Sequence, residues 1–342
     1  MRAMPLNNKN VLFVTAAGCC LAAASGFTFG QRHHFADAIG SQDVVANGLW
    51  VFLIGVLVGG LTKDLLGARI AICISAVFFG IGAIGSLQAS SILWLALGGG
   101  VALAVCNGIF ESPSADAAGR WLNFTHAFYR CTSLIVVAFW VPVEVVKWFG
   151  LLGAGLALAL YRTPQEPLPE ENTVVMRRGG LLLIALLTLN FLTGAFELWS
   201  ERVYVDRLLD TIENVGLLLA GAMFLGRLAA STAWFSGNRQ LFICSLMASL
   251  ATLLFPLAHG IWQLGLAVIG AFFSASIFPA VLGMVSVITQ RWRGLACSFG
   301  QMSCMVAALL TTRASGLALV PGVSLLLISA WLLWSSGNQS RR

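Results

Sequence analysis

The chain is a series of long apolar segments separated by short polar stretches. Twelve segments are long enough to cross a bilayer, because a helix needs about 20 mostly apolar residues to span the hydrocarbon core. Their predicted bounds are 11–31, 45–62, 70–88, 91–113, 122–141, 143–161, 180–199, 214–235, 240–258, 261–288, 295–312 and 316–335. The segments are rich in Leu and Ala and lack the period-two alternation of membrane strands. Because backbone groups in lipid must satisfy one another, the pattern predicts helices.

The composition supports the same interpretation. Apolar residues make up 58% of the 342 positions and charged residues only 10%, whereas soluble domains average about 25% charged residues. So few charged residues are not enough to cover a surface that faces water. Accordingly, we expect the chain to be surrounded by the lipid bilayer. We therefore predict an all-α polytopic membrane protein with twelve transmembrane helices in two bundles of six.

The distribution of positive charge predicts the orientation. With both termini cytoplasmic, 15 of the 20 Lys and Arg residues fall on the inner side, and the outer side receives Arg32, Lys147, Arg202, Arg207 and Arg313. Cytoplasmic loops carry such an excess. The net charge of +6 then reflects orientation. It does not indicate nucleic-acid binding, which would need the basic residues gathered on one soluble face. Short loops and the absence of targeting motifs favour a bacterial inner membrane, with an organelle membrane as the alternative.

One central polar stretch divides the chain. Residues 162–178 contain three prolines and several charges, a composition typical of a linker. The predicted organisation is an N-terminal six-helix bundle at 1–162, a cytoplasmic linker at 163–178 and a C-terminal six-helix bundle at 179–342. Parallel repeats of six helices with the substrate site between them are a recurrent transporter design.

The loop after the second span carries a recognisable motif. Its sequence runs Gly60-Leu-Thr-Lys-Asp64-Leu-Leu-Gly67-Ala-Arg69 and resembles the G-x-x-x-D-x-x-G-R-[RK] signature of the major facilitator superfamily, with Ala68 at a position where Arg is usual. The resemblance implies a transporter in which Asp64, Gly67 and Arg69 serve gating. Asp64 can pair with a basic residue or cap a neighbouring helix end, which would hold an inner gate shut. The alternative is an ordinary solvated turn.

Shorter patches resemble the fucose-permease-like branch of that superfamily. They are Asn107–Glu111, Leu122–Tyr129, Gly194–Trp199 and the pair Phe278-Pro279. This resemblance implies a sugar as substrate. Arg130 replaces the Gly that usually follows Tyr129, so the sequence departs from the branch at that point.

Ionisable groups inside the membrane are the best candidates for coupling. An Arg or Asp at mid-helix costs about 2.5–3.5 kcal/mol by insertion scales, so such groups persist when they pair or act. Glu111 is expected in the cytoplasmic half of the fourth span, and His126 and Arg130 lie one helical turn apart in the fifth. We predict that the three form a proton-coupling network, since imidazole titrates near neutral pH. The alternative is a static salt bridge near the headgroups.

The candidate substrate contacts are polar or aromatic groups in the spans. A carboxylate suits sugar hydroxyls and an aromatic ring suits the apolar face of a sugar, although a Trp near a span end also favours the headgroup level. A buried amide alternatively makes an interhelical hydrogen bond. The predicted contacts are Asn107, Asn190, Glu197, Trp199, Phe278 and Gln301. Pro279 is expected to kink its helix.

The leading functional prediction is a secondary active transporter that moves a small polar, sugar-like solute by alternating access with protons. No G-x-x-x-x-G-K-[ST] loop is present in the sequence, so direct ATP coupling is excluded. The alternative is an exporter of amphiphilic drugs or small organic metabolites. Remote alternatives are a transport-dead receptor and a membrane-embedded enzyme, which four histidines without HxxxH spacing disfavour. We expect a monomer with no cofactor and no metal.

Overall fold

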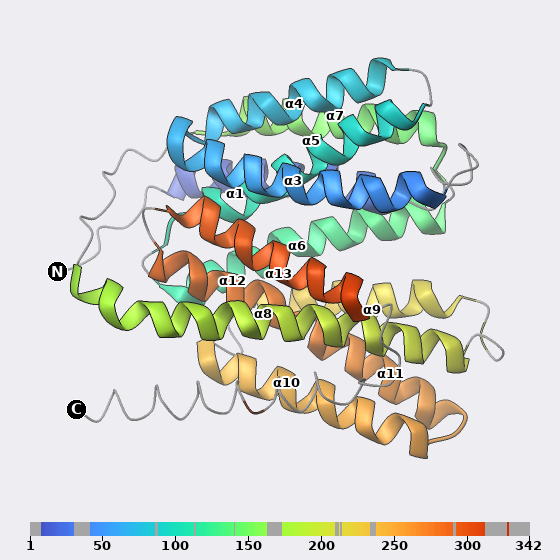
Figure 1. The fold of residues 1–342 in the computed structure, drawn as a ribbon. Coiled ribbons are helices and arrows are strands. Elements are labelled where there is room, and N and C mark those ends of the chain that lie inside the picture. The colour runs from blue at the N-terminus through green and yellow to red at the C-terminus, as the bar shows by residue number, and fades with distance from the viewer. Residues whose placement is uncertain are drawn as a thin grey trace. The chain divides into compact units, whose positions relative to one another are not determined.

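The structure, a computed structural model, describes residues 8–30, 42–85, 88–112, 114–139, 141–162, 173–208, 212, 214–232, 237–289, 292–311 and 327. Within these residues the regular elements are helices (Figure 1). Seven of them are long and apolar enough to cross a membrane, and Ala68–Ile84 and Val215–Ser231 are shorter apolar helices. The predicted span 316–335 lies outside the described residues apart from Leu327. The all-α, multi-pass character is therefore confirmed, and the number of spans stays a prediction.

The first compact unit comprises Met1–Ser112, Phe128–Glu171 and Thr289–Ser298. Its helices include α1 (Asn8–Gly30), α3 (Gln42–Leu66), α4 (Ala68–Ile84), α5 (Ala89–Ile109) and α7 (Val143–Leu160). Helix α5 is mostly buried and packs against α1, α3 and α4, with which it lies side by side in Figure 1. A Cβ at Gly100 of α5 would collide with the Phe52 carbonyl of α3. Glycine thus lets these two helices touch through their backbones.

The second compact unit comprises Pro113–Ala127, Asn172–Ile288 and Phe299–Arg342. It contains α8 (Thr173–Leu208), α9 (Val215–Ser231), α10 (Gly237–Leu254), the 3₁₀ turn η1 (Phe255–Leu257), α11 (Ile261–Ser274) and α12 (Ile277–Ile288). Tyr204 of α8 anchors its apolar core, where the phenol contacts the Phe255 ring and hydrogen-bonds to Thr252 at 2.5 Å. A buried tyrosine needs such a partner for its hydroxyl.

Two helices contribute residues to both units. They are α6 (Ala115–Ala138) and α13 (Arg293–Thr311). The unit boundaries therefore do not coincide with the predicted bundles 1–162 and 179–342, which stay a prediction.

Two helix ends differ from the sequence-based bounds for identifiable reasons. Helix α5 ends at Ile109 and not at 113, because Ser112 precedes Pro113 and the residue before a proline disfavours the helical region. Helix α8 begins inside the predicted linker, at Thr173, and continues to Leu208 through charged residues that were predicted to lie beyond its end. Tyr204 and Leu208 are buried in the core of the second unit, so packing extends this helix.

The predicted kink near Pro279 is confirmed as a break. The span 261–288 consists of α11 and α12, and the helix is interrupted at Ala275 and Ser276. Proline lacks the N–H that an uninterrupted helix requires, and its ring crowds the carbonyl four residues earlier.

Candidate functional site

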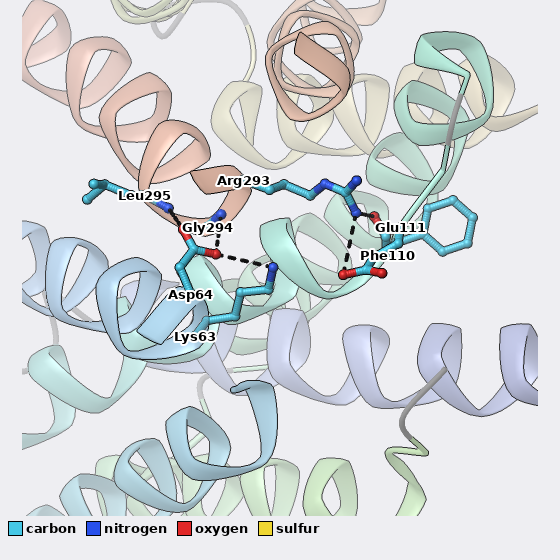
Figure 2. Close-up of polar contacts among 7 residues, drawn as sticks. All are labelled: Lys63, Asp64, Phe110, Glu111, Arg293, Gly294 and Leu295. Atoms are coloured by element: carbon cyan, nitrogen blue, oxygen red, sulfur yellow. Dashed lines mark hydrogen bonds and ion pairs between the residues drawn. The ribbon is translucent and has the colours of Figure 1, made fainter. Parts of the chain in front are cut away.

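Asp64, near the end of α3, caps the first turn of α13. Its Oδ1 accepts a hydrogen bond from the Gly294 N–H at 3.0 Å, and its Oδ2 accepts one from the Leu295 N–H at 2.8 Å. Figure 2 shows the carboxylate pointing at both amides, with the Lys63 ammonium 3.3 Å from Oδ1. The residue before α13 is Trp292, an indole that donates only, so the cap has to come from another element. A carboxylate at a helix N-terminus stabilises it by about 0.3–1 kcal/mol, or more when partly buried.

Glycines make this contact sterically feasible. A Cβ at Gly294 would lie 2.7 Å from the Gly60 carbonyl and 2.8 Å from Asp64 Oδ1, and a Cβ at Gly60 would collide with Ser298 Oγ. The Ser298 hydroxyl in turn donates to the Val56 carbonyl at 2.8 Å. The start of α13 and the end of α3 therefore approach at backbone distance.

Gly67 and Arg69 belong to the turn that follows. Gly67 is the N-cap of α4 with φ 93° and ψ 160°, a region populated essentially by glycine alone. Arg69 lies in the first turn of α4 and is exposed. The sequence expected Asp64 either to pair with a basic residue or to cap a helix, and the geometry contains both contacts. The gating role of Asp64, Gly67 and Arg69 stays a prediction.

Glu111 lies beside the Asp64 cap, beyond the end of α5. The sequence-based placement of Glu111 inside the fourth span is therefore wrong. The residue follows the end of α5 by two positions, and its Oε1 is 3.9 Å from Arg293 Nη1. Arg293 also donates to the Phe110 carbonyl at 3.1 Å (Figure 2). The positive first residue of α13 thus holds the chain that leaves α5.

His126 and Phe278 meet in the second unit. Both are buried, and their rings contact edge to face with centroids 5.5 Å apart and an interplanar angle of 71°. Arg130 lies one turn further along α6 and is partly buried. Since Glu111 belongs to the first unit and His126 to the second, the coupling network of Glu111, His126 and Arg130 stays a prediction.

Asn190 of α8 is the most informative of the predicted substrate contacts. Its exposed fraction is 0%, and neither its Nδ2 nor its Oδ1 has a hydrogen-bond partner among the described residues. A Cβ at Gly300 of α13 would lie 2.8 Å from Asn190 Nδ2, so a side chain at residue 300 would force the amide to shift. An unsatisfied buried amide costs about 1–3 kcal/mol. The interhelical hydrogen bond that would explain it structurally is not found among these residues.

The other predicted contacts occupy varied positions. Glu197 and Trp199 are half-buried on α8, where the Trp199 ring lies 6.5 Å from that of Phe196. Gln301, on α13, and Asn107, on α5, are buried. Asn107 belongs to the first unit, and the remaining predicted substrate contacts belong to the second. Their roles stay predictions.

Two arginines with structural contacts were not singled out from the sequence. Arg293 and Arg227 were counted only among the 15 basic residues of the predicted inner side. The structure places Arg227 inside α9 with an exposed fraction of 3%. A charge within an apolar segment is itself a signal of function, and that signal would have identified Arg227.

The helical architecture defines the class of fold. The chain has the fold of the major facilitator superfamily, a class of membrane transporters. One similar solved structure is the E. coli fucose:proton symporter FucP, with a TM-score of 0.70 and 12% identity over 94% of this chain and 97% of that one. The human organic anion transporter MFSD10 matches with a TM-score of 0.66 and 17% identity over 97% and 99% of the two chains. The proton:xylose symporter XylE matches with a TM-score of 0.65 and 14% identity over 96% of this chain and 95% of that one.

The sequence comparisons give no such relationship. No protein-family model matches the chain, and no curated protein matches it significantly. The structural likeness confirms the resemblance to major facilitator transporters, at the level of the fold.

Proposed function

We propose that the protein is a secondary active transporter that moves a small polar, sugar-like solute by alternating access, coupled to protons. The observation that carries this proposal is structural likeness to transporters over nearly the whole chain, with 94% of it matched to the fucose:proton symporter. The similar structures named above are transporters, not enzymes.

The buried amide of Asn190 supports a polar solute. Its donor and acceptor atoms are buried without a partner among the described residues, and a solute hydroxyl can serve as both donor and acceptor. Glu197 and Gln301 would add polar contacts, while Trp199 and Phe278 would cover an apolar face of the solute. Asn107 would contribute from α5. Together, these predicted contacts favour a neutral solute over a strongly charged one.

Proton coupling is assigned to Glu111, His126 and Arg130. Glu111 is partly exposed and only loosely paired with Arg293, at 3.9 Å, so it remains accessible to protons. His126 is buried against Phe278, where a change in its charge would affect a predicted solute contact. Asp64, Gly67 and Arg69 form the proposed cytoplasmic gate, whose capping contact would have to break when the gate opens.

The second candidate is export of small organic metabolites or amphiphilic drugs. It is favoured by the likeness to a human organic anion transporter, which is as extensive as the likeness to the sugar symporters. In either case we propose a monomer with both termini cytoplasmic, located in a bacterial inner membrane.

The direct test is uptake by purified protein in proteoliposomes. Labelled fucose and xylose are the first probes, followed by small organic anions, each with and without an inward proton gradient. Accumulation that requires the gradient supports the proposal, and accumulation of organic anions alone favours the second candidate. Binding without accumulation indicates a receptor, and chemical change of the probe indicates an enzyme.

The site assignment has its own test. A thermal-shift screen of solutes on the parent is repeated on Glu111→Gln and Glu197→Gln, with Asp206→Asn as the control. Asp206 is an exposed acid on α8, and its variant should behave like the parent. Glu197→Gln should weaken the thermal shift caused by the solute. In the uptake assay described above, Glu111→Gln should lose the dependence of uptake on the proton gradient. If both variants match the parent, the assignment is wrong.

A further inference from the structure

The break between α11 and α12 leaves one carbonyl in need of a partner. Pro279 has no N–H to donate to the residue four positions earlier, which is Ala275. That carbonyl lies in an apolar span, where water is not available to replace the lost hydrogen bond. Some other donor must satisfy it.

Arg227 of α9 is that donor. Its Nε donates to the Ala275 carbonyl at 3.0 Å, and the side chain is buried. Gly226, the residue before Arg227, allows the side chain to reach this carbonyl because it lets the two helices come close. A Cβ at position 226 would collide with the Phe272 carbonyl of α11. Helix α9 therefore approaches α11 at backbone distance, one residue before the guanidinium.

The same guanidinium also holds α6. Arg227 Nη1 donates to the His126 carbonyl at 3.2 Å. Arg227 thus bridges the backbone of α6, which carries the His126 ring, and the break just before α12, which carries the Phe278 ring. Those two rings contact each other, with their centroids 5.5 Å apart.

Arginine suits this position because of its shape. The guanidinium is planar and presents five N–H donors in a rigid fork, whereas a lysine ammonium is a compact point charge on a flexible stem. Two carbonyls from different helices are bridged in one fixed geometry only by the fork. A buried charge is also costly in a membrane unless its donors are used, so its retention requires such acceptors.

We propose that Arg227 is a positioning residue for the solute site. By bridging the Ala275 and His126 carbonyls, it sets the contact between His126 and Phe278, to which the proposed function assigns coupling and solute binding. The inference rests on that function for its purpose, while the positioning itself is a structural claim. It assigns Arg227 a role beyond orienting the protein in the membrane.

The first test observes the His126 ring without any solute. The chain has only four histidines, so selective ¹³C-histidine labelling of the protein in nanodiscs gives a simple spectrum, and His126→Gln identifies the signal. Phe278→Leu removes the ring current and marks the position of a His126 signal without its neighbour. We expect Arg227→Gln to move the signal at least halfway to that position, and Arg227→Lys to move it less.

Arg239→Gln is the matched control. Arg239 is an exposed arginine on α10, so its loss removes the same charge and should leave the His126 signal in place. An unmoved signal in folded Arg227→Gln overturns the proposal. Should that variant not fold, Arg227→Lys decides: a displaced His126 signal supports the proposal, because lysine cannot span both carbonyls, and an unmoved signal overturns it.

The second test asks whether Arg227 serves the Ala275 carbonyl. Pro279→Ala restores an N–H at residue 279, which gives this carbonyl a helical partner. The drop in thermal midpoint caused by Arg227→Gln or Arg227→Lys should then be smaller in the Pro279→Ala background than in the parent. Equal drops overturn the proposal. Neither test depends on uptake, so a failure here leaves the transport proposal standing, and a lack of uptake leaves these tests valid.

Discussion

At the scale of single residues, Asn190 and Asp64 represent opposite uses of a polar side chain. Asp64 satisfies two backbone amides at the start of α13, so its contribution to stability is visible in the folded structure. Asn190 makes no hydrogen bond among the described residues although it is fully buried. A group that costs stability and persists is best explained by function.

Asn190→Leu therefore separates stability from activity. Leucine has a similar volume and removes the unsatisfied amide, so the thermal midpoint of the purified protein should stay the same or rise. Uptake, or the solute affinity obtained from the thermal shift, should fall by roughly 5- to 30-fold, since the loss of a hydrogen-bonding group costs about 1–2 kcal/mol. Thr188→Val, at an exposed threonine on the same helix, is the control. A marked loss of stability in Asn190→Leu would instead indicate a structural amide.

Asp64→Ala should loosen the first turn of α13. Removal of a capping side chain costs about 0.5–2 kcal/mol, which corresponds to roughly 2- to 30-fold faster hydrogen exchange at the Gly294 and Leu295 amides. Asp64→Asn should have a smaller effect, because an amide oxygen still accepts one hydrogen bond but carries no charge. Exchange measured by mass spectrometry on the α13 peptide checks this. Unchanged exchange in Asp64→Ala would show that the cap does not hold this turn.

At the scale of elements, close approach of helices depends on which glycine faces a neighbour. Gly221 and Gly226 both lie on α9 at similar sequence context, yet a Cβ at Gly221 would meet nothing within 4 Å while one at Gly226 would collide with the Phe272 carbonyl. Glycine content predicts tight packing in general, and the structure identifies the contact.

Gly226→Ala and Gly221→Ala therefore form a matched pair. Gly226→Ala forces α9 away from α11 and should destabilise the protein by about 1–3 kcal/mol, as overpacking does. Gly221→Ala should be neutral or stabilising, because alanine favours helix by about 1 kcal/mol relative to glycine. The two variants are compared by their thermal midpoints in the same detergent. Equal midpoints would contradict the packing described here.

The turn between α3 and α4 depends on backbone conformation and not on space. Gly67 has nothing within 4 Å of a Cβ, yet its φ is 93°. Gly67→Ala should therefore destabilise the start of α4 by about 1–3 kcal/mol. The control is Gly155→Ala on α7, where a Cβ also meets nothing within 4 Å and no positive φ is present. Hydrogen exchange of the α4 peptide should increase in the first variant alone, and an increase in both would refute this explanation.

At the scale of the whole molecule, orientation follows from the asymmetry of positive charge. With 15 of 20 basic residues on the predicted inner side, both termini are expected in the cytoplasm. An epitope tag at each end should be digested by protease in inside-out vesicles and protected in right-side-out vesicles. Tags that respond oppositely would prove an odd number of spans and remove the basis for two bundles of six.

The extent of sequence-based prediction differs between fold and site. The helices, the break near Pro279 and the capping ability of Asp64 were all predictable, because each depends on local chemistry at known spacing. Glu111 was placed inside α5 because apolar neighbours outweighed the effect of Pro113 on Ser112. The length of α8 was underestimated, since core packing of Tyr204 and Leu208 overrides the local charges Glu201 and Arg202. The contacts of Arg227 and Arg293 were not predictable, because their acceptors lie far away in the sequence.

By itself, the sequence determined the solvent, the element type and the division into short-looped apolar helices. Those properties follow from transfer free energies and backbone hydrogen bonding, which act on each segment independently of its neighbours. Only the tertiary structure decided which polar groups are satisfied. Asp64 found two amides on α13, Arg227 found the carbonyls of Ala275 and His126, and Asn190 found no partner among the described residues. Hydrogen bonds require contact within about 3 Å, and contact between distant segments is a property of packing.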